Sequence, residues 1–209
     1  MSLPVVCFDL GNVLVHLRFE RCLRAMCRLS GRNYAQFSQL TPPFFDEHGL
    51  ALSRGALSAD AFLGLFAAQF GLERLDLGIV AAAWASIFDP FAAMEALAAE
   101  CIDNGATVWL LSNTDPMHFN YLLTKMPVLD RMAGWHLSYE IGWNKPDPQY
   151  YQLFLQRLGR AAEQCVFFDD RPENVAAAVQ LGMDARLFAG DVAAARADLA
   201  ALGVIRDER

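Results

Sequence analysis

Two short apolar runs end in aspartate, and these are the first residues whose type and placement could do chemistry. The run at 3–8 leads into Asp9 and then the pair Gly11 and Asn12, and the run at 165–168 leads into Asp169 and Asp170. A short apolar run bounded by turn residues is typical of a buried strand. Ligands of open α/β sheets bind at the carboxyl ends of the strands, so we expect three carboxylates at a binding edge.

Other polar groups follow further apolar segments. The run at 106–111 leads into Ser112 and Asn113 and then into a predicted helix, whose free backbone N–H groups favour an anion. Lys145 lies in the loop at 142–146, and Asn174 follows Asp170 by four residues. Together the set offers carboxylates, an ammonium and a hydroxyl, which suit a hard cation and a phosphoryl group.

Each of these residues also has a structural interpretation. Asp9 could cap a turn, and Asp169 and Asp170 could cap the helix that begins near Pro172. Lys145 could be an ordinary surface lysine. One cap does not require two acids after an apolar strand, and the combination indicates more than any member, so we favour a binding site.

The elements that must position these groups follow a regular alternation from residue 89 onward. Strands alternating with helices of about 10 to 15 residues are typical of a parallel sheet with right-handed crossovers. The predicted later strands are 106–111, 136–141, 165–168 and 185–188, and the predicted later helices are 90–101, 115–125, 147–158, 172–181 and 192–202.

The segment between the first strand and residue 89 shows helical patterns and no strand. Predicted helices cover 19–29, 34–40, 59–70 and 77–88, with a break at Thr41-Pro42-Pro43 because neither proline can donate a backbone hydrogen bond. The sequence therefore predicts a core made of 1–15 and 89–209 and a helical insert of 16–88. Since the insert leaves the core just after Asp9, we expect a lid that excludes water.

Composition excludes several classes of protein. Of the 209 residues 55% are apolar, but no run approaches the roughly 18 that a membrane-spanning helix needs. The formal charge is −7 without a basic run, which argues against nucleic acid or an anionic membrane as a partner. The five cysteines form no CxxC, and we find no secretory signal, so we expect reduced thiols and a cytoplasmic location.

Four segments resemble the motifs of the haloacid dehalogenase superfamily of phosphohydrolases. They occur in the family's order: FDLGNVLV with Asp9, LLSNT with Ser112, NKP with Lys145, and FFDDRPEN with Asp169 and Asp170. The insert resembles that family's helical cap of the first type. The motif sequences are most similar to those of the branch that contains glucose-1-phosphate phosphatases and the phosphatase domain of soluble epoxide hydrolases. The resemblance implies an α/β fold, with a Rossmann-like parallel sheet, helices on both faces and an all-helical cap.

The resemblance also implies roles for these residues. Asp9 would attack phosphorus and form an aspartyl-phosphate that water later hydrolyses. Magnesium would be held by Asp9, the carbonyl of Gly11 and Asp170, with Asn174 on a metal-bound water. Ser112, Asn113 and Lys145 would bind the phosphoryl oxygens, and Asp169 would orient Lys145.

The sequence departs from the family pattern at Gly11. Most phosphatases of the family carry a second aspartate there, which protonates the leaving group. Its absence predicts a slow enzyme, a substrate with a good leaving group, or a general acid supplied by the cap. His16 is the first candidate for that acid. Arg21 could reach the substrate, and Trp143 could border its pocket. Each of the three residues also has a structural alternative: His16 could be a hinge residue, Arg21 a solvated surface charge and Trp143 a packing residue.

Four cap aromatics, Phe44, Phe45, Trp84 and Phe88, are expected to form lid core rather than a substrate platform. The favoured hypothesis is a magnesium-dependent phosphatase acting on a small phosphorylated metabolite, a sugar phosphate above others, as a monomer or homodimer. Two alternatives stay open: a binding protein that lost turnover with the second aspartate, and a metal-independent 2-haloacid dehalogenase using Asp9 on carbon.

Overall fold

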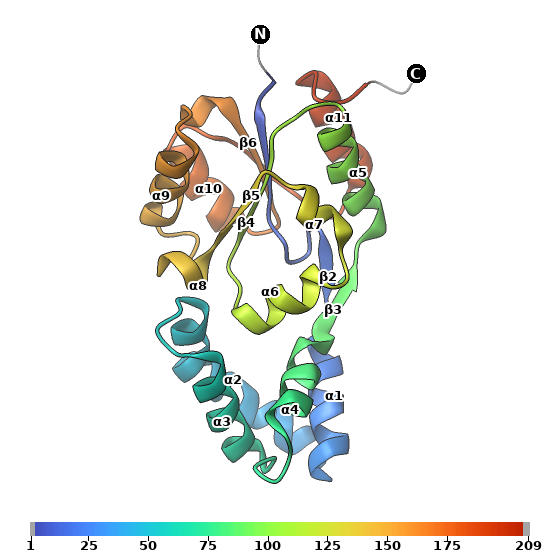
Figure 1. Ribbon diagram of the computed structural model, residues 1–209, viewed down its shortest axis with the longest axis vertical. Helices are drawn as coiled ribbons and strands as arrows, with labels where there is room; N and C mark the ends of the chain where they lie inside the picture. The colour runs from blue at the N-terminus through green and yellow to red at the C-terminus, as the bar shows by residue number, and fades with distance from the viewer. Residues whose placement is uncertain (1–2, 207–209) are drawn as a thin grey trace.

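The computed structural model describes residues 3–206, and its centre is a five-stranded sheet (Figure 1). The strand order is β5-β4-β1-β6-β7, and every neighbouring pair is parallel. The α/β sheet predicted from the alternation is confirmed. The strands are β1 (Val5–Phe8), β4 (Val108–Ser112), β5 (Gly134–Leu137), β6 (Cys165–Asp169) and β7 (Asp184–Leu187).

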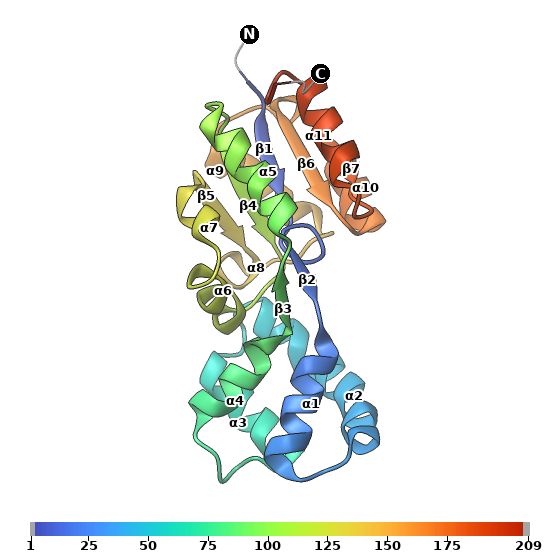
Figure 2. The ribbon, with the colours of Figure 1, turned by 90° about the vertical axis from the view of Figure 1, so that its right-hand side faces the viewer.

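Helices cover both faces of this sheet, as Figures 1 and 2 show. Successive strand residues point to opposite faces: Val6 and Phe8 join one apolar cluster, and Val5 and Cys7 join the other. Helices α5 (Ala92–Asp103) and α11 (Val192–Ala201) contribute to the first cluster, and α9 (Pro148–Leu158) and α10 (Pro172–Gln180) to the second. The remaining core helices are α6 (Pro116–Leu123), α7 (Pro127–Arg131), α8 (Ser138–Ile141) and the 3₁₀ turn η2 (Ala162–Gln164).

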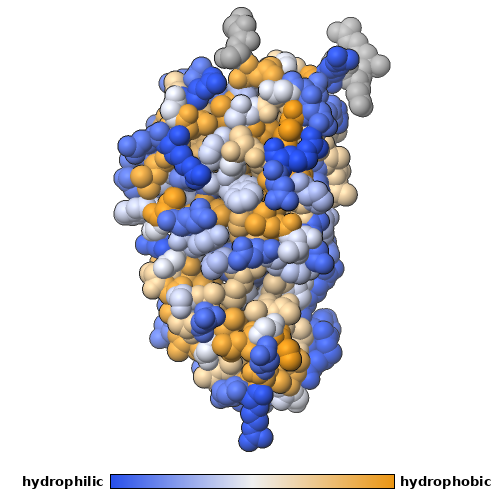
Figure 3. Space-filling view, viewed as in Figure 1, coloured by the Kyte–Doolittle hydropathy of each residue, from blue (hydrophilic) through white to orange (hydrophobic). Residues whose placement is uncertain are grey.

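The insert forms a separate lobe of helices below the sheet in Figures 1 and 2. Stacked and edge-on aromatic rings fill its interior, among them Phe37, Phe44, Phe66 and Phe70. Figure 3 shows hydrophobic and hydrophilic residues intermixed over the face of the insert that it displays. No helix within residues 3–206 has the length and apolar character to span a membrane. The four helices are α1 (Phe19–Ser30), α2 (Tyr34–Ser53), α3 (Ala59–Phe70) and α4 (Leu77–Trp84).

The ends of α3 are as predicted, but the break at Thr41-Pro42-Pro43 is wrong. Ser58 caps the N-terminus of α3 by accepting from the Ala61 N–H, and Gly71 ends it in the left-handed conformation. Helix α2 instead runs through both prolines. The exposed prolines leave carbonyls on the solvent side, where water can satisfy them, while buried Phe37 and Phe44 hold the two halves of the helix in the aromatic interior.

The insert is not wholly helical, which corrects a second prediction. Strands β2 (Val15–Leu17) and β3 (Phe88–Pro90) pair antiparallel where the chain passes between the lobes. The predicted helix 77–88 ends at Trp84 and continues as the 3₁₀ turn η1 (Ala85–Ile87). The predicted strand 136–141 is also shifted: it ends at Leu137, and helix α8 follows.

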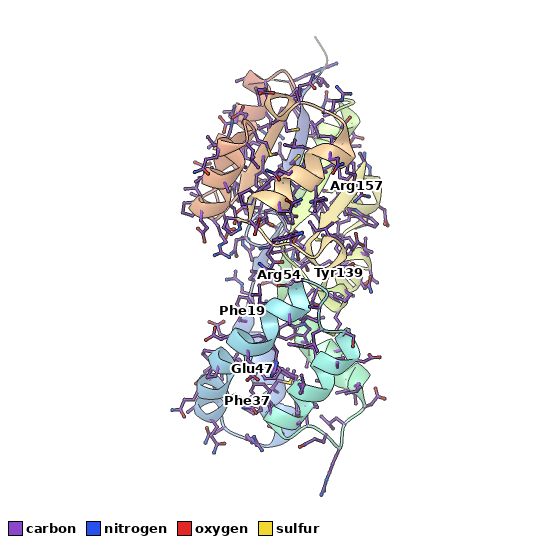
Figure 4. All side chains as sticks on the ribbon, turned by 90° about the vertical axis from the view of Figure 1, so that its left-hand side faces the viewer. Phe19, Phe37, Glu47, Arg54, Tyr139 and Arg157 are labelled. Atoms are coloured by element: carbon purple, nitrogen blue, oxygen red, sulfur yellow. The ribbon has the colours of Figure 1, made fainter. Side chains whose placement is uncertain are left out.

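A second contact joins the lobes at the C-terminal end of α2, where Figure 4 shows Arg54 beside Tyr139. The Asn144 side-chain amide donates to the Ser53 hydroxyl at 2.7 Å, and the Arg54 guanidinium lies over the Trp143 ring. A Cβ on Gly55 would lie 2.2 Å from the Tyr139 carbonyl oxygen. The insert is therefore held to the core at two separate places.

The close approach at Gly55 predicts a specific loss of stability. Gly55 has φ +68° and Gly142 has φ +79°, but nothing lies within 4 Å of a Cβ on Gly142. Left-handed strain costs either alanine variant about 1 kcal/mol. Gly55→Ala adds a collision with backbone, so we expect it to lower the melting temperature several degrees more than Gly142→Ala in calorimetry. Equal losses would show that the lobes are not in contact there.

Buried His136 predicts a pH-dependent stability. Its Nε2 donates to the Tyr150 carbonyl at 2.9 Å, and burial lowers its pKa to about 4. Between pH 6.5 and 4 the unfolded chain binds a proton that the folded chain excludes. Stability is therefore fully present above this window and falls as pH drops through it, by about 2 kcal/mol at pH 5.

The measurement is urea unfolding at pH 7 and pH 5 for the native chain and His136→Gln. Burial raises the pKa of Asp9, which gives the opposite slope in part of this range, so the difference between the two proteins isolates His136. We expect the variant to lose less stability on acidification. An unchanged pH dependence would contradict the assignment of a neutral buried imidazole.

Candidate active site

Polar side chains lie at the carboxyl ends of three neighbouring strands, at one edge of the sheet. Asp9 follows β1, while Ser112 and Asp169 are the last residues of β4 and β6, on either side of it. The carboxyl ends of these strands point toward the lobe of α1–α4 (Figure 2). All three side chains are buried, so the fold brings them together as the sequence predicts and removes them from bulk water.

Lys145 lies at the centre of this edge. Its ammonium donates to Asp9 Oδ1 at 2.7 Å, to Asp169 Oδ2 at 2.6 Å and to the Leu111 carbonyl at 2.9 Å. The side chain is almost fully buried. Burial disfavours the ammonium, but Asp9 and Asp169 outweigh it and raise the pKa of Lys145 above its ordinary value. Lys145 therefore supplies a fixed positive charge at the edge of the sheet.

The Asp9 carboxyl has a higher pKa than is usual for an aspartate. Burial raises the pKa of its carboxyl to about 6; Lys145 opposes this shift, and the negative charge of Asp169 adds to it. The carboxyl is thus costly to ionise even beside the Lys145 ammonium. A second positive charge at this place would favour the ionised form, which is the nucleophilic one.

Asn113 fixes the loop that carries Lys145. Its side-chain Nδ2 donates to the Lys145 carbonyl, and its Oδ1 accepts from the Lys145 N–H, each at 2.8 Å. The sequence placed Asn113 among the phosphate-binding residues. The structure puts its side chain on the backbone of Lys145 and its residue at the wall of two cavities.

The three carboxylates form a cluster that could hold a cation. Oxygens of Asp9, Asp169 and Asp170 lie within 4.8 Å of one another. Asn174 Nδ2 donates to both oxygens of Asp169, while its Oδ1 is buried and has no partner among residues 3–206. An unpaired buried acceptor beside carboxylates fits a hydrated hard cation, because such an ion supplies the missing donor through its water.

Asn12 is a site residue that the sequence analysis used only as a turn former. It has a positive φ of 55°, and its side-chain Nδ2 donates to Asp170 Oδ2 at 2.9 Å. Its backbone N–H donates to the Val15 carbonyl. Asn12 thus closes the turn after Asp9 and orients Asp170. The signal was its residue type, because asparagine enters the left-handed region more readily than most residues.

The position of the missing second aspartate is partly filled by a neighbour. A Cβ on Gly11 would lie 3.1 Å from Cδ1 of Leu17, which lies on β2. Residues other than glycine can adopt the backbone conformation of Gly11, because its φ is not positive. The obstacle to an acid at this position is therefore the Leu17 side chain.

Three further residues predicted near the site are engaged elsewhere. The His16 ring stacks on Phe91 at 4.3 Å, and Arg21 makes a double ion pair with Asp89 on β3, at 2.5 and 2.7 Å. Both lie where β2 and β3 connect the lobes. Trp143 lies under Arg54 at the second contact. None of the three lines the cavities described next.

Two adjoining cavities lie against these groups. A polar hollow of about 160 Å³ is bounded by Asp9, Asp170 and Asn174, and a larger one of about 510 Å³ extends from it toward the insert. The two cavities have four lining residues in common, Gly11, Leu17, Asn113 and Arg171. Three aromatics expected in the lid core, Phe45, Trp84 and Phe88, line the larger cavity, whereas Phe44 is buried in the lid. The geometry therefore places groups that could bind an anion and a cation beside a cavity of about 510 Å³.

Comparisons with known proteins agree with this geometry. The model of the family described as hydrolase, haloacid dehalogenase-like hydrolase, matches residues 3–182. A sesquiterpene phosphatase of Aspergillus oryzae is 28% identical over 130 residues, which are 62% of this chain and 66% of that protein. A flavin mononucleotide hydrolase of Arabidopsis thaliana is 33% identical over 89 residues, 43% of this chain and 36% of that protein. These two alignments thus cover only part of each relative.

Longer matches come from Bacteroides thetaiotaomicron. Its D-ribitol-5-phosphate phosphatase is 24% identical over 189 residues, 86% of this chain and 88% of that protein. A solved structure of a haloacid dehalogenase family enzyme from the same organism, a complex with magnesium and inorganic phosphate, superposes with a TM-score of 0.78 at 24% identity, covering 91% of this chain and 96% of that one. With the family model matching most of its length, this chain belongs to the haloacid dehalogenase-like hydrolase family.

Proposed function

We propose that this protein is a magnesium-dependent phosphatase that hydrolyses a small phosphate monoester through an aspartyl-phosphate on Asp9. The observation that carries the proposal is the arrangement around Lys145, which holds Asp9 beside the acidic cluster and at the wall of the polar hollow. Relatives named as phosphatases of a sesquiterpene compound and of ribitol 5-phosphate support the reaction class.

The reaction divides into two steps. A carboxylate oxygen of Asp9 attacks phosphorus, the ester P–O bond breaks, and the leaving oxygen departs with the electron pair and takes a proton from solvent water. Water then attacks the phosphorus of the acyl phosphate, which releases inorganic phosphate and restores the carboxylate. Splitting the hydrolysis in this way replaces one difficult step by two easier ones.

The chain's own groups would serve these steps as follows. Lys145 and the Ser112 hydroxyl would bind phosphoryl oxygens, where negative charge develops in the transition state. Asp169 would keep Lys145 in place, and Asn113 would fix its loop. Bound magnesium, held by Asp9, Asp170, the Gly11 carbonyl and the water on Asn174, would neutralise charge between the two anions.

We also propose that residues 1–15 and 89–209 act as the catalytic core and 16–88 as its cap. The β2–β3 pair, where both chain crossings lie, and the contact of Ser53 with Asn144 support this division. A cap above the sheet edge would exclude water from the reaction. The predicted sugar phosphate, the cytoplasmic location and the monomeric or dimeric state remain predictions.

The experiment is an assay of phosphate release from a panel of aryl phosphates and sugar phosphates. We expect turnover with added magnesium and its loss in excess chelator, with recovery when magnesium is restored. Magnesium binding without release of phosphate from any substrate would favour a binding protein instead. Turnover that is indifferent to the chelator would contradict the metal-dependent mechanism.

The space at Gly11 gives a separate prediction. Gly11→Asp alone should gain little, because Leu17 crowds the new side chain. Combined with Leu17→Ala, the aspartate has room to protonate a leaving group, and general acid help is typically worth about 10²–10⁴-fold. We expect the double variant to be faster than Leu17→Ala on alkyl phosphates, whose leaving groups are poor, and little changed on aryl phosphates. An equal effect on both substrates would count against a missing acid.

A further inference from the structure

A third cavity, which we call the inner cavity, lies on the insert and adjoins the larger one. This inner cavity, of about 340 Å³, shares the side chains of Phe19, Phe45 and Trp84 with the 510 Å³ cavity beside the active site. The polar hollow, the outer cavity and the inner cavity therefore adjoin in series. Their combined size is in the range of sites that hold drug-sized molecules rather than the smallest metabolites.

The walls become less polar with distance from Asp9. The inner cavity is bounded by aromatic and aliphatic side chains, with Thr41 its one hydroxyl among the lining residues, and that hydroxyl donates to the Phe37 carbonyl at 2.6 Å. Phe19, which lines both apolar cavities, is 56% exposed, and Figure 4 shows it where the two lobes meet. Phe19 therefore contributes apolar surface to both cavities at this junction.

Three polar side chains of the outer cavity, those of Ser53, Asp115 and His118, are already hydrogen-bonded within the protein. The Ser53 hydroxyl donates to the Leu50 carbonyl and accepts from Asn144. Asp115 accepts from the Trp84 indole at 3.2 Å and pairs with His118 at 2.8 Å, and the other nitrogen of His118 faces the Trp84 carbonyl. These three side chains have less capacity left for the hydroxyls of a polyol, and each unpaired hydroxyl buried beside them would weaken binding.

We propose that the substrate is a phosphate monoester of an apolar, preferably aromatic, alcohol, whose body lies against Phe19 and the stacked pair Phe45 and Trp84 and whose tail enters the inner cavity. This proposal rests on the proposed phosphatase function and names a different substrate class from the predicted sugar phosphate, so the two predictions can be tested against each other. Glycine at position 11 agrees with it, because a phenolate leaves readily without an acid and an alkoxide does not.

The first test compares phenyl, 4-butylphenyl and 4-octylphenyl phosphate, used below the concentrations at which they form micelles. Their leaving groups are nearly equal in basicity, so only the apolar tail differs. Burial of a methylene predicts a rise in kcat/KM of roughly two- to fourfold per carbon until the cavity is filled. Glucose 1-phosphate and ribitol 5-phosphate should be poorer substrates than phenyl phosphate.

A matched pair of variants locates the effect. Leu23 lines the inner cavity, and Leu65 lines a different cavity on the insert that shares none of these walls. We expect Leu23→Trp to fill the inner cavity and bring the ratio of kcat/KM for octylphenyl to phenyl phosphate close to one. Leu65→Trp should keep the native ratio. A native ratio in Leu23→Trp would overturn the proposal.

Binding separates this proposal from the phosphatase mechanism. Phenylphosphonate and 4-octylphenylphosphonate cannot be hydrolysed in the same way, and calorimetry with the magnesium-loaded protein measures their affinities directly. Tighter binding of the octyl compound, lost in Leu23→Trp, supports the apolar site even if no substrate turns over. Equal affinities, or a preference for sugar phosphates alongside normal turnover, would overturn the apolar site and leave the phosphatase function standing.

Discussion

Asp9→Asn is expected to reduce phosphate release by at least about a thousandfold, because an amide cannot form the acyl phosphate on which both steps depend. The asparagine keeps the volume of the aspartate, and its oxygen can still accept from Lys145. Loss of a carboxylate whose pKa burial has raised removes a buried charge, so the variant should stay folded.

The measurement is single-turnover and steady-state phosphate release with magnesium at neutral pH. Asp46→Asn is the matched control, since Asp46 is exposed on the insert and should tolerate the change without effect. Circular dichroism and thermal unfolding establish that both variants are folded. Substantial turnover by Asp9→Asn would rule out Asp9 as the nucleophile.

Lys145→Met is expected to damage both stability and turnover. It removes the cation that lies between Asp9 and Asp169, and two buried carboxylates then face each other without compensation. Breaking a buried ion pair by removing one partner costs about 3–5 kcal/mol. Activity should fall by about a hundredfold or more, because the phosphoryl group also loses a positive contact.

A second substitution separates the two losses. Asp169→Asn in the Lys145→Met background removes one of the uncompensated charges, so urea unfolding should show partial recovery of stability while turnover stays low. Lys125→Met, a change at the chain's other lysine, which is exposed, is the control. Recovery of turnover together with stability would assign Lys145 a structural role only.

The central sheet and its chemical edge could be predicted because both depend on local signals. Short apolar runs mark the buried strands, and parallel strands bring their carboxyl ends to one edge, so Asp9, Ser112 and Asp169 could be placed together from their positions after those runs. The family resemblance added roles for the residues, and the family match later confirmed the family itself.

Features that depend on packing could not be predicted in the same way. Local propensity breaks a helix at Pro42 and Pro43, but burial of Phe37 and Phe44 holds α2 together across them. The β2–β3 pair joins segments more than seventy residues apart, each too short to show a pattern of its own. Pairing across such a distance is visible only after folding.

The outer and inner cavities show the same limit for side chains. Phe45 and Trp84 have the composition of lid core, and only the structure shows that both also border cavities. The distinction matters, because the proposal of an apolar alcohol as the leaving group depends on these cavity walls. Residue type alone carries no information on which side of a helix a cavity will form.

The most direct test of the aspartyl-phosphate mechanism is chemical trapping of Asp9. The protein is mixed with magnesium and an aryl phosphate, quenched during turnover and treated with borohydride, which reduces an acyl phosphate to the corresponding alcohol. Mass spectrometry of the peptide that contains residue 9 should then show homoserine in place of Asp9, only when substrate was present. Phosphate release with Asp9 unmodified under the same conditions would contradict the mechanism.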